Sequence, residues 1–89
     1  MTYLAKNYNR KKISFKYGKG SYLFSNDKKK YLDFVQGIAV NSLGHAHPSL
    51  VKAIKNQSKK LWHVSNAFQI PEGEKLAKNL CKKTFADYV

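Results

Sequence analysis

The segment Gly37–Pro48 constrains the fold of this chain most, because it is apolar, interrupted by glycine and closed by a proline. Its residues read Gly-Ile-Ala-Val-Asn-Ser-Leu-Gly-His-Ala-His-Pro. Proline is favoured at the first position of a helix, where its missing N–H leaves no hydrogen bond unmade. We therefore expect a helix to begin at Pro48, followed by the aromatic and polar loop Leu61–Phe68. This arrangement suits the wall of a buried site better than a surface module.

The chain is short for its apolar content. It has 89 residues, of which 43% are hydrophobic and twelve are aromatic. A chain of this size buries only about 60–65% of its unfolded surface. A few short strands and helices cannot cover twelve aromatic rings, so we expect part of the apolar surface to meet later residues or a partner subunit.

The net charge of +12 makes nucleic acid or an anionic membrane a candidate partner. The composition argues against it, because sixteen of the seventeen basic residues are lysine and only Arg10 is arginine. The planar guanidinium group of arginine forms bidentate hydrogen bonds with phosphates and base edges, which the ammonium group of lysine does not. A small basic nucleic-acid-binding protein remains the alternative from a different class, and it predicts retention on DNA or RNA that falls steeply with salt. The lysines are spread over every expected element, for example Lys6, Lys16, Lys28, Lys52, Lys59, Lys75 and Lys82.

Targeting and redox features favour a cytoplasmic protein. Cys81 is the only cysteine, so no internal disulfide is expected. The first residues lead into Lys6 and a basic run without the apolar region of a signal peptide. No apolar run approaches the roughly eighteen residues that a membrane span needs.

The first third of the chain predicts an antiparallel meander of three short strands. Apolar and polar residues alternate over residues 13–17, which is the pattern of a half-buried strand. The glycines of Gly18–Gly20 are expected to break that strand. A second strand is expected at 22–24, a turn at 25–28 and a third strand at 31–35.

Two helices are expected after the meander. The first runs from Pro48 to Trp62, and the second opens at Pro71 with acidic residues in its first turn and Lys82 and Lys83 near its end. The residues Phe85–Val89 read as the approach to a further strand. The buried face of the second helix is expected to comprise Leu76, Ala77, Leu80 and Cys81.

No residue pattern here completes a metal or catalytic site. A zinc site needs three or four ligands in tight spacing, and only His45 and His47 are close, with His63 and Cys81 distant. His47 is better placed to cap or flank the helix start. Serines lie near histidines in sequence, but no third orienting group accompanies any of them.

Most of the chain resembles the start of the class III pyridoxal-phosphate aminotransferases, the ornithine-type group. The segments occur in the family's order and spacing, which makes the resemblance specific. They are Gly18–Leu23, Lys30–Phe34, Gly37–Val40, Leu43–Pro48, Ala53 and Ile54 with Gln57, and Leu61–Asn66.

The resemblance implies an α+β segment of an α/β pyridoxal-phosphate transferase of fold type I. An N-terminal arm and antiparallel meander would occupy residues 1–36, and a site-wall segment with helices would occupy residues 37–89. No complete domain is expected within residues 1–89.

The resemblance also implies which residues face the substrate. Tyr8 matches a position whose ring approaches the substrate, and Gly37, Ile38 and Ala39 match a pocket wall. The ornithine-specific members carry tyrosine at the position of Ile38, whereas acetylornithine and 4-aminobutyrate members carry an aliphatic residue. Ser65 and Asn66 match a loop near the active site of a homodimer.

The chain departs from the family in the turn between the second and third strands. Family members usually carry glycine where this chain has Lys28, and aspartate where it has Ser25. A lysine with positive φ would cost about 1 kcal/mol, so we expect this turn to differ from that of the family.

The resemblance assigns no catalytic, cofactor-binding or metal-binding residue to this chain. In the family, the Schiff-base lysine, the acid that pairs with the pyridinium nitrogen and the phosphate cradle all follow the region matched here. None of the sixteen lysines matches the Schiff-base position. The 89-residue chain is therefore expected to be inactive alone and to bind pyridoxal phosphate weakly.

Within the family, the resemblance favours the acetylornithine branch. The parent enzyme would transfer an amino group between N-acetylornithine and 2-oxoglutarate in arginine biosynthesis, as a cytoplasmic homodimer. Another class III activity, on ornithine, 4-aminobutyrate or succinyldiaminopimelate, remains the alternative within the family. A stand-alone interaction domain is a further alternative, and it predicts cooperative unfolding of the isolated chain.

Overall fold

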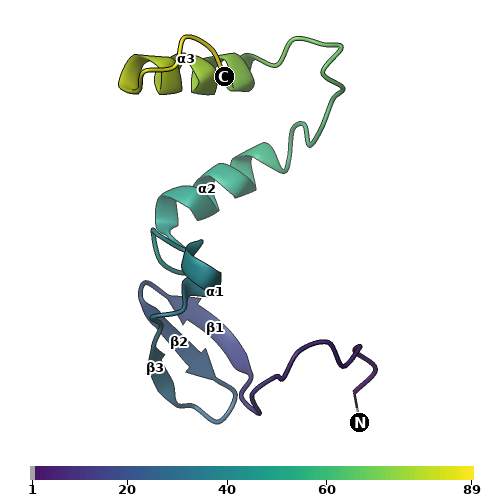
Figure 1. Cartoon of the computed structure of the whole chain (residues 1–89), viewed down its shortest axis with the longest axis vertical. Helices are drawn as coiled ribbons and strands as arrows, with labels where there is room; N and C mark the ends of the chain where they lie inside the picture. The colour runs from purple at the N-terminus through teal and green to yellow at the C-terminus, as the bar shows by residue number, and fades with distance from the viewer. Residues whose placement is uncertain (1) are drawn as a thin grey trace. The chain divides into compact units, whose positions relative to one another are not determined.

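The computed structural model describes residues 2–89 and contains a three-stranded sheet followed by helices (Figure 1). The chain divides into two compact units, one ending at Ile54 and one comprising Lys55–Val89. None of the helices in this part of the chain has both the length and the apolar content that a bilayer crossing requires. The elements are β1 (Phe15–Lys19), β2 (Tyr22–Ser25), β3 (Lys30–Leu32), α1 (Gln36–Ala39), α2 (Pro48–Gln57) and α3 (Pro71–Lys83).

The predicted antiparallel meander is confirmed, with β2 between β1 and β3. The predicted strand break at Gly18 is wrong, because β1 continues to Lys19 and Gly18 pairs with Leu23. Glycine serves here as a strand residue without a side chain, so that another part of the chain can approach closely. The register shifts between Phe15 and Tyr17, which is a bulge in β1.

The turn between β2 and β3 keeps a positive φ at Lys28, although the strain of a lysine at that position led us to expect a different turn. Lys28 has a φ of 64°, in the left-handed region that favours glycine. The Ser25 hydroxyl donates a short hydrogen bond to Asp27, and Lys29 pairs with the same carboxylate at 3.0 Å. The Lys29 N–H also donates to the Ser25 Oγ at 3.1 Å. Side-chain bonds therefore hold a turn that contains no glycine.

The third strand is shorter than predicted, since β3 ends at Leu32 instead of Val35. Asp33 ends it, because its carboxylate accepts hydrogen bonds from the N–H groups of Val35 and Gln36 and so turns the chain. Aspartate commonly turns the chain by bonding backbone N–H groups two and three residues ahead.

Helix α2 begins at Pro48 as predicted, but it ends at Gln57 rather than at Trp62. Its end is closed by hydrogen bonds that turn the chain off the helix axis. The Gln57 Nε2 donates to the Leu61 carbonyl at 2.8 Å, and the Trp62 Nε1 donates to the Ser58 carbonyl at 2.7 Å. Leu61 and Trp62 therefore lie beyond the helix instead of extending its apolar stripe.

Helix α3 confirms the second predicted helix. Its proline lies in the first turn, Glu72 and Glu74 follow it, and Lys82 and Lys83 occupy the last turn. These charges complement the helix dipole at both ends. Residues 85–89 form no strand, the chain bends there and Phe85 is fully exposed, so the approach to a further strand stays a prediction.

No hydrophobic side chain among residues 2–89 is buried. The expected buried face of α3 is open, with Leu76 at 60% exposure and Cys81 half-buried. The sheet carries aromatic rings on both faces. Tyr17 stacks on Phe24 with ring centroids 4.5 Å apart, while Phe15 meets Tyr31 edge-on at 5.6 Å on the opposite face.

Candidate functional site

Element α1 is a single left-handed turn. Its residues Gln36, Gly37, Ile38 and Ala39 have φ values of 52°, 61°, 67° and 61°. The N–H groups of Ile38 and Ala39 both donate to the Val35 carbonyl, at 2.9 and 3.0 Å. A non-glycine residue in this region costs about 1–2 kcal/mol, and a β-branched residue such as isoleucine rarely adopts it. Backbone strain of this kind concentrates at functional sites, where surrounding groups hold it in place.

Asp33 is the group that holds the turn. Its Oδ1 accepts the Val35 N–H at 3.0 Å and the Gln36 N–H at 2.9 Å. Its Oδ2 lies 2.6 Å from the Nε2 of His45. The Gln36 N–H, and next the His45 ring, lower the pKa of Asp33 from its ordinary value of 3.8. An ionised carboxylate has only acceptor atoms, so the His45 Nε2 carries the hydrogen of this contact.

His45 is held in turn by the end of the sheet. Its N–H donates to the Gly20 carbonyl at 2.8 Å, and its carbonyl accepts the Gly20 N–H at 3.1 Å. A Cβ on Gly18 would lie 2.5 Å from the Cγ of His45, so only glycine leaves room for the ring on β1. Gly44 has a φ of 78°, and a Cβ there would lie 2.8 Å from the Gly20 carbonyl oxygen. Three glycines therefore allow the histidine to sit against the sheet.

An apolar cavity of about 510 Å³ lies beside this turn. Phe15, Leu23 and Tyr31 contribute its sheet side, and Gly37 and His45 belong to its other walls. Aromatic and aliphatic side chains dominate this lining, and its polar members are Asp33, His45 and Asn41. The cavity therefore suits an uncharged or aliphatic group better than an ammonium group.

The structure groups only some of the residues predicted to face the substrate. Gly37, Ile38 and Ala39 share the left-handed turn, and Ile38 is 85% exposed there. Tyr8 lies on the N-terminal arm with its ring 5.3 Å from the guanidinium carbon of Arg10. No hydrogen bond or ring contact within residues 2–89 joins Tyr8 to the turn.

Ser65 and Asn66 lie in the unit Lys55–Val89, on the exposed loop between α2 and α3. The Ser65 Oγ accepts the Ala67 N–H at 3.2 Å, and the Ser65 carbonyl accepts the Phe68 N–H at 3.0 Å. Ser65 thus shapes a tight turn and leaves its neighbour Asn66 at the surface. Their predicted role at a dimeric active site stays a prediction.

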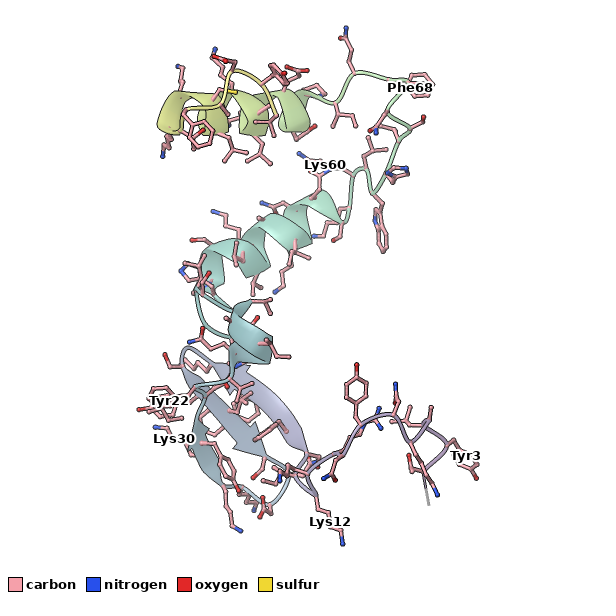
Figure 2. The ribbon with its side chains drawn as sticks, viewed as in Figure 1. Tyr3, Lys12, Tyr22, Lys30, Lys60 and Phe68 are labelled. Atoms are coloured by element: carbon pink, nitrogen blue, oxygen red, sulfur yellow. The ribbon has the colours of Figure 1, made fainter. Side chains whose placement is uncertain are left out.

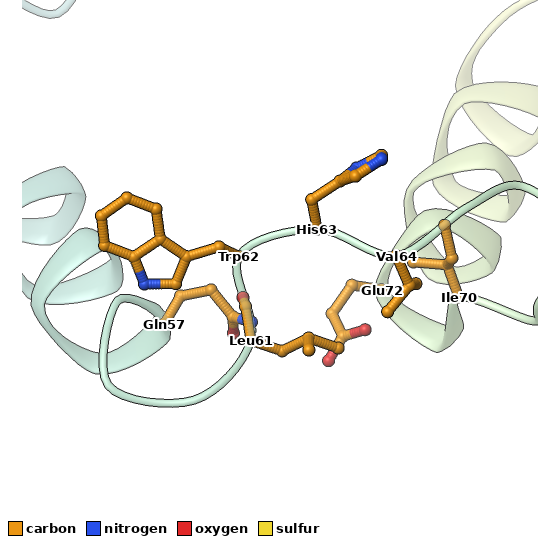
Figure 3. Close-up of a pocket in the computed structure, with 7 residues that line it drawn as sticks. All are labelled: Gln57, Leu61, Trp62, His63, Val64, Ile70 and Glu72. Atoms are coloured by element: carbon orange, nitrogen blue, oxygen red, sulfur yellow. The ribbon is translucent and has the colours of Figure 1, made fainter.

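The same unit contains a second, smaller cavity of about 270 Å³ at the end of α2 (Figure 3). It lies next to the loop that carries Ser65 and Asn66. Trp62 is 86% exposed at its edge, and its indole N–H is already bonded to the Ser58 carbonyl. The lining residues are Gln57, Leu61, Trp62, His63, Val64, Ile70 and Glu72.

His45 and His47 both have hydrogen-bond partners within the chain. As predicted, His47 lies at the start of α2, where its Nδ1 accepts the Ser49 N–H at 3.2 Å. Residues 2–89 contain no group of three or more side chains that could hold a metal ion.

The Asp33–His45 pair was missed by the reading of the sequence. The sequence predicts a strand at Asp33, and it offers His45 as a possible metal ligand and as part of the family-like segment Leu43–Pro48. The one available signal was an aspartate before an apolar residue and a glycine-containing segment, a context in which aspartate often bonds its own backbone. Nothing in the sequence pointed to His45 as its partner.

The sheet and helices are those of the N-terminal region of α/β transferases of fold type I, with which the structure aligns. Residues 3–89 match the model of the family described as Aminotransferase class-III. The chain belongs to the class III aminotransferase family, whose members depend on pyridoxal phosphate.

Similar proteins from several organisms support this assignment. Acetylornithine aminotransferase 1 of Bradyrhizobium diazoefficiens is 55% identical over 80 residues, which cover 90% of this chain and 20% of the relative. This chain thus spans about a fifth of the length of the curated relatives it matches.

Solved structures of two enzymes share the fold. N-acetylornithine aminotransferase from Stenotrophomonas maltophilia K279a aligns with a TM-score of 0.75 and 35% identity, covering 83% of this chain and 20% of that one. Ornithine delta-aminotransferase from Plasmodium falciparum aligns with a TM-score of 0.89 and 30% identity, covering 97% of this chain and 23% of that one. The backbone is therefore shared by enzymes named for different amino donors.

The described residues do not fit pyridoxal phosphate. A lysine that forms a Schiff base needs a desolvated setting that lowers its pKa. Every lysine of the chain is exposed, and the bond to Asp27 raises the pKa of Lys29 instead of lowering it. Asp33, the buried acid of residues 2–89, already uses both carboxylate oxygens. These residues leave the cofactor's contacts to other polypeptide.

Proposed function

We propose that this chain forms the N-terminal substrate-wall segment of an acetylornithine aminotransferase. The observation that carries the proposal is the 55% identity to an acetylornithine aminotransferase over 90% of the chain. The parent enzyme would act with pyridoxal phosphate as a cytoplasmic homodimer in arginine biosynthesis. Residues 1–36 would form its arm and meander, and residues 37–89 its site wall and first helices.

The substrate class is supported by the residue at the centre of the left-handed turn. Ile38 exposes an aliphatic side chain at the turn. The neighbouring cavity, which Gly37 lines and Ile38 does not, is bounded mainly by apolar side chains. A free ammonium group next to such a surface would lose hydration without gaining a partner. An acylated amine has no charge at that end, so an N-acetyl group fits this wall better than the free amine of ornithine.

The role of these residues is to bind and to exclude water, not to transfer protons. The turn would set the position of the aliphatic wall, and the arm with Tyr8 would close over the substrate's side chain. Ser65 and Asn66 would contribute from the loop after α2 to the interface between two subunits. The groups that hold the cofactor would come from the remaining four fifths of the enzyme.

Ornithine transamination is the second candidate. It is favoured by the structural alignment with the Plasmodium falciparum ornithine delta-aminotransferase, whose TM-score is 0.89. Against it stands Ile38, at the position where the ornithine-specific members carry tyrosine.

The test is a direct comparison of amino donors. The complete enzyme that carries this segment would be assayed with 2-oxoglutarate and either N-acetylornithine or ornithine. We expect kcat/KM to be at least about 10-fold higher for N-acetylornithine, a ratio within reach of one well-matched pocket. A higher value for ornithine would select the second candidate, and no transamination with either donor would refute the proposal.

A further inference from the structure

Asp33 is a buried carboxylate in a segment where no hydrophobic side chain is buried. Its relative exposure is 8%, and Ser25 is the other buried polar residue of residues 2–89. A charged group is withdrawn from water only where specific partners replace the water. Both oxygens of Asp33 are satisfied, one by two backbone N–H groups and the other by His45. The buried and fully bonded carboxylate of Asp33 is therefore not explained by packing of a hydrophobic core.

We infer that Asp33 is a positioning residue for the substrate wall: its carboxylate, oriented by His45, holds the left-handed turn that presents Ile38. The inference rests on the proposed function for the identity of the substrate. It assigns to Asp33 and His45 no contact with substrate or cofactor.

The turn needs an external restraint because three of its residues are not glycine. Gln36, Ile38 and Ala39 all have positive φ, and none would keep that conformation on its own preference. The two N–H groups that Asp33 binds lie at the entrance to the turn, on Val35 and Gln36. Without that acceptor, the N–H groups would turn to water and the φ angles would relax to negative values. The Ile38 side chain would then point elsewhere.

His45 connects this restraint to the sheet. Its backbone is fixed to Gly20 by two hydrogen bonds, and its ring lies over Gly18. From there its Nε2 reaches the Oδ2 of Asp33 at 2.6 Å. The position of the turn is thus transmitted from β1 through His45 and Asp33, which lie twelve residues apart in sequence.

Asparagine separates geometry from charge at this position. In Asp33→Asn the Oδ1 still accepts the two N–H groups, and the Nδ2 donates to His45 in its Nδ1–H tautomer. In Asp33→Ala both functions are lost. If the acceptor geometry positions the wall, Asp33→Asn should restore most of what Asp33→Ala removes.

The experiment uses the complete enzyme and two readouts. Steady-state kinetics with N-acetylornithine give KM and kcat, and hydrogen exchange measured by mass spectrometry follows the peptide covering residues 34–41. For Asp33→Ala we expect KM to rise about 10-fold with kcat within about 3-fold, the signature of lost binding that is equal in ground and transition states. We expect the amides of Val35 and Gln36 to exchange faster. Asp33→Asn should return both readouts toward the wild-type values.

Asp27→Ala is the matched control. Like Asp33, Asp27 is an aspartate whose carboxylate is bonded within a tight turn, in its case by the Ser25 hydroxyl and Lys29. It lies in the turn before β3, and no hydrogen bond or ion pair within residues 2–89 joins it to His45 or α1. It should leave both readouts unchanged. If Asp33→Ala does not fold, His45→Ala takes its place and should raise KM and speed exchange in the same direction.

Unchanged KM and unchanged exchange in the folded Asp33 or His45 variant would overturn the inference. A fall in kcat alone would also overturn it, since that would place Asp33 in the chemical step. If instead the proposed function is wrong, the wild-type enzyme will not transaminate N-acetylornithine. The hydrogen exchange of residues 34–41 in the variants will still show whether Asp33 restrains the turn.

Discussion

Lys28 and Ile38 both adopt the left-handed region, but for different reasons. Lys28 has a φ of 64° in a solvent-exposed turn, where side-chain bonds between Ser25, Asp27 and Lys29 close the loop. Ile38 has a φ of 67° in the turn that Asp33 restrains, next to an apolar cavity. The backbone strain is similar at both positions, but only the second side chain has a proposed task.

Glycine substitution should therefore separate stability from function. In the complete enzyme, we expect Lys28→Gly to raise the free energy of unfolding by about 0.5–1 kcal/mol. Glycine adopts positive φ without steric strain, and this gain outweighs the additional chain entropy that glycine loses on folding. Its kcat/KM should not change. Ile38→Gly should relieve the same strain yet lower kcat/KM for N-acetylornithine by about 10-fold. Denaturant titration and steady-state kinetics measure both effects, and an active Ile38→Gly enzyme with unchanged KM would contradict this assignment of the wall.

The Asp33 carboxylate should make the turn sensitive to acid. Hydrogen bonding, chiefly from the Gln36 N–H, lowers its pKa below the ordinary 3.8. A carboxyl group with a depressed pKa in the folded state stabilises that state fully above its unfolded pKa. The contribution is lost as the pH falls through the lower, folded-state pKa.

We therefore expect the urea midpoint of the wild-type enzyme to exceed that of Asp33→Ala at about pH 5.5, and the difference between the two midpoints to narrow as the pH falls below 3.8, the ordinary pKa of the carboxyl group. Equilibrium unfolding at a series of pH values measures this gap. A gap that stays constant down to acid pH would mean that Asp33 acts through packing and not through its charge.

At the scale of the elements, glycine is required at two positions near His45 but not at the glycine of α3. Gly18 and Gly44 admit His45 and the Gly20 backbone at distances that no Cβ would permit. Gly73 lies in the first turn of α3, where a Cβ would meet the Ile70 side chain at an ordinary 3.7 Å. The first two positions require glycine, and the third does not.

Alanine substitutions should display this contrast. Gly44→Ala would force a Cβ to within 2.8 Å of the Gly20 carbonyl oxygen at a φ of 78°, and we expect it to cost about 1–3 kcal/mol. Gly73→Ala, its matched control, should stabilise α3 by about 0.5–1 kcal/mol through helix propensity. Thermal unfolding of the complete enzyme should show a lower midpoint for the first variant and a higher one for the second. Equal unfolding midpoints for the two variants would show that Gly44 does not lie close to the Gly20 carbonyl in the complete enzyme.

At the scale of the whole molecule, the exposed apolar surface dominates. No hydrophobic side chain of residues 2–89 is buried, and both faces of the sheet display aromatic rings. The ammonium group of Lys30 lies over one of these exposed rings, Tyr22, 4.0 Å from its centroid (Figure 2). Antiparallel sheets commonly leave one face to water, but both faces of this sheet are apolar. Such a sheet is stable only when other polypeptide covers it.

The isolated 89-residue chain should accordingly lack a cooperative unfolding transition. Without a buried core, different probes should report different, shallow transitions. Mixed with pyridoxal phosphate, it should show no imine absorbance that borohydride fixes to a single lysine. Calorimetry, circular dichroism and mass spectrometry of the reduced sample test both statements. A sharp, coincident transition would support a stand-alone domain, and a stoichiometric adduct would place a cofactor lysine within these residues.

The order of the residues alone was sufficient for the family, the three-stranded meander and the starts of both long helices. These features depend on short-range signals, such as the alternation over residues 13–17 and the prolines at Pro48 and Pro71. The lysine at position 28 led us to expect a changed turn, yet its φ of 64° keeps the left-handed conformation. Only the tertiary structure revealed where β3 ends, that β1 continues through Gly18, and that residues 36–39 form a left-handed turn. At these places Asp33 bonds the backbone N–H groups after β3 and the ring of His45, twelve residues away, and Gly18 leaves room for that ring. A contact of that length is set by the path of the whole backbone, which no local pattern of side chains encodes.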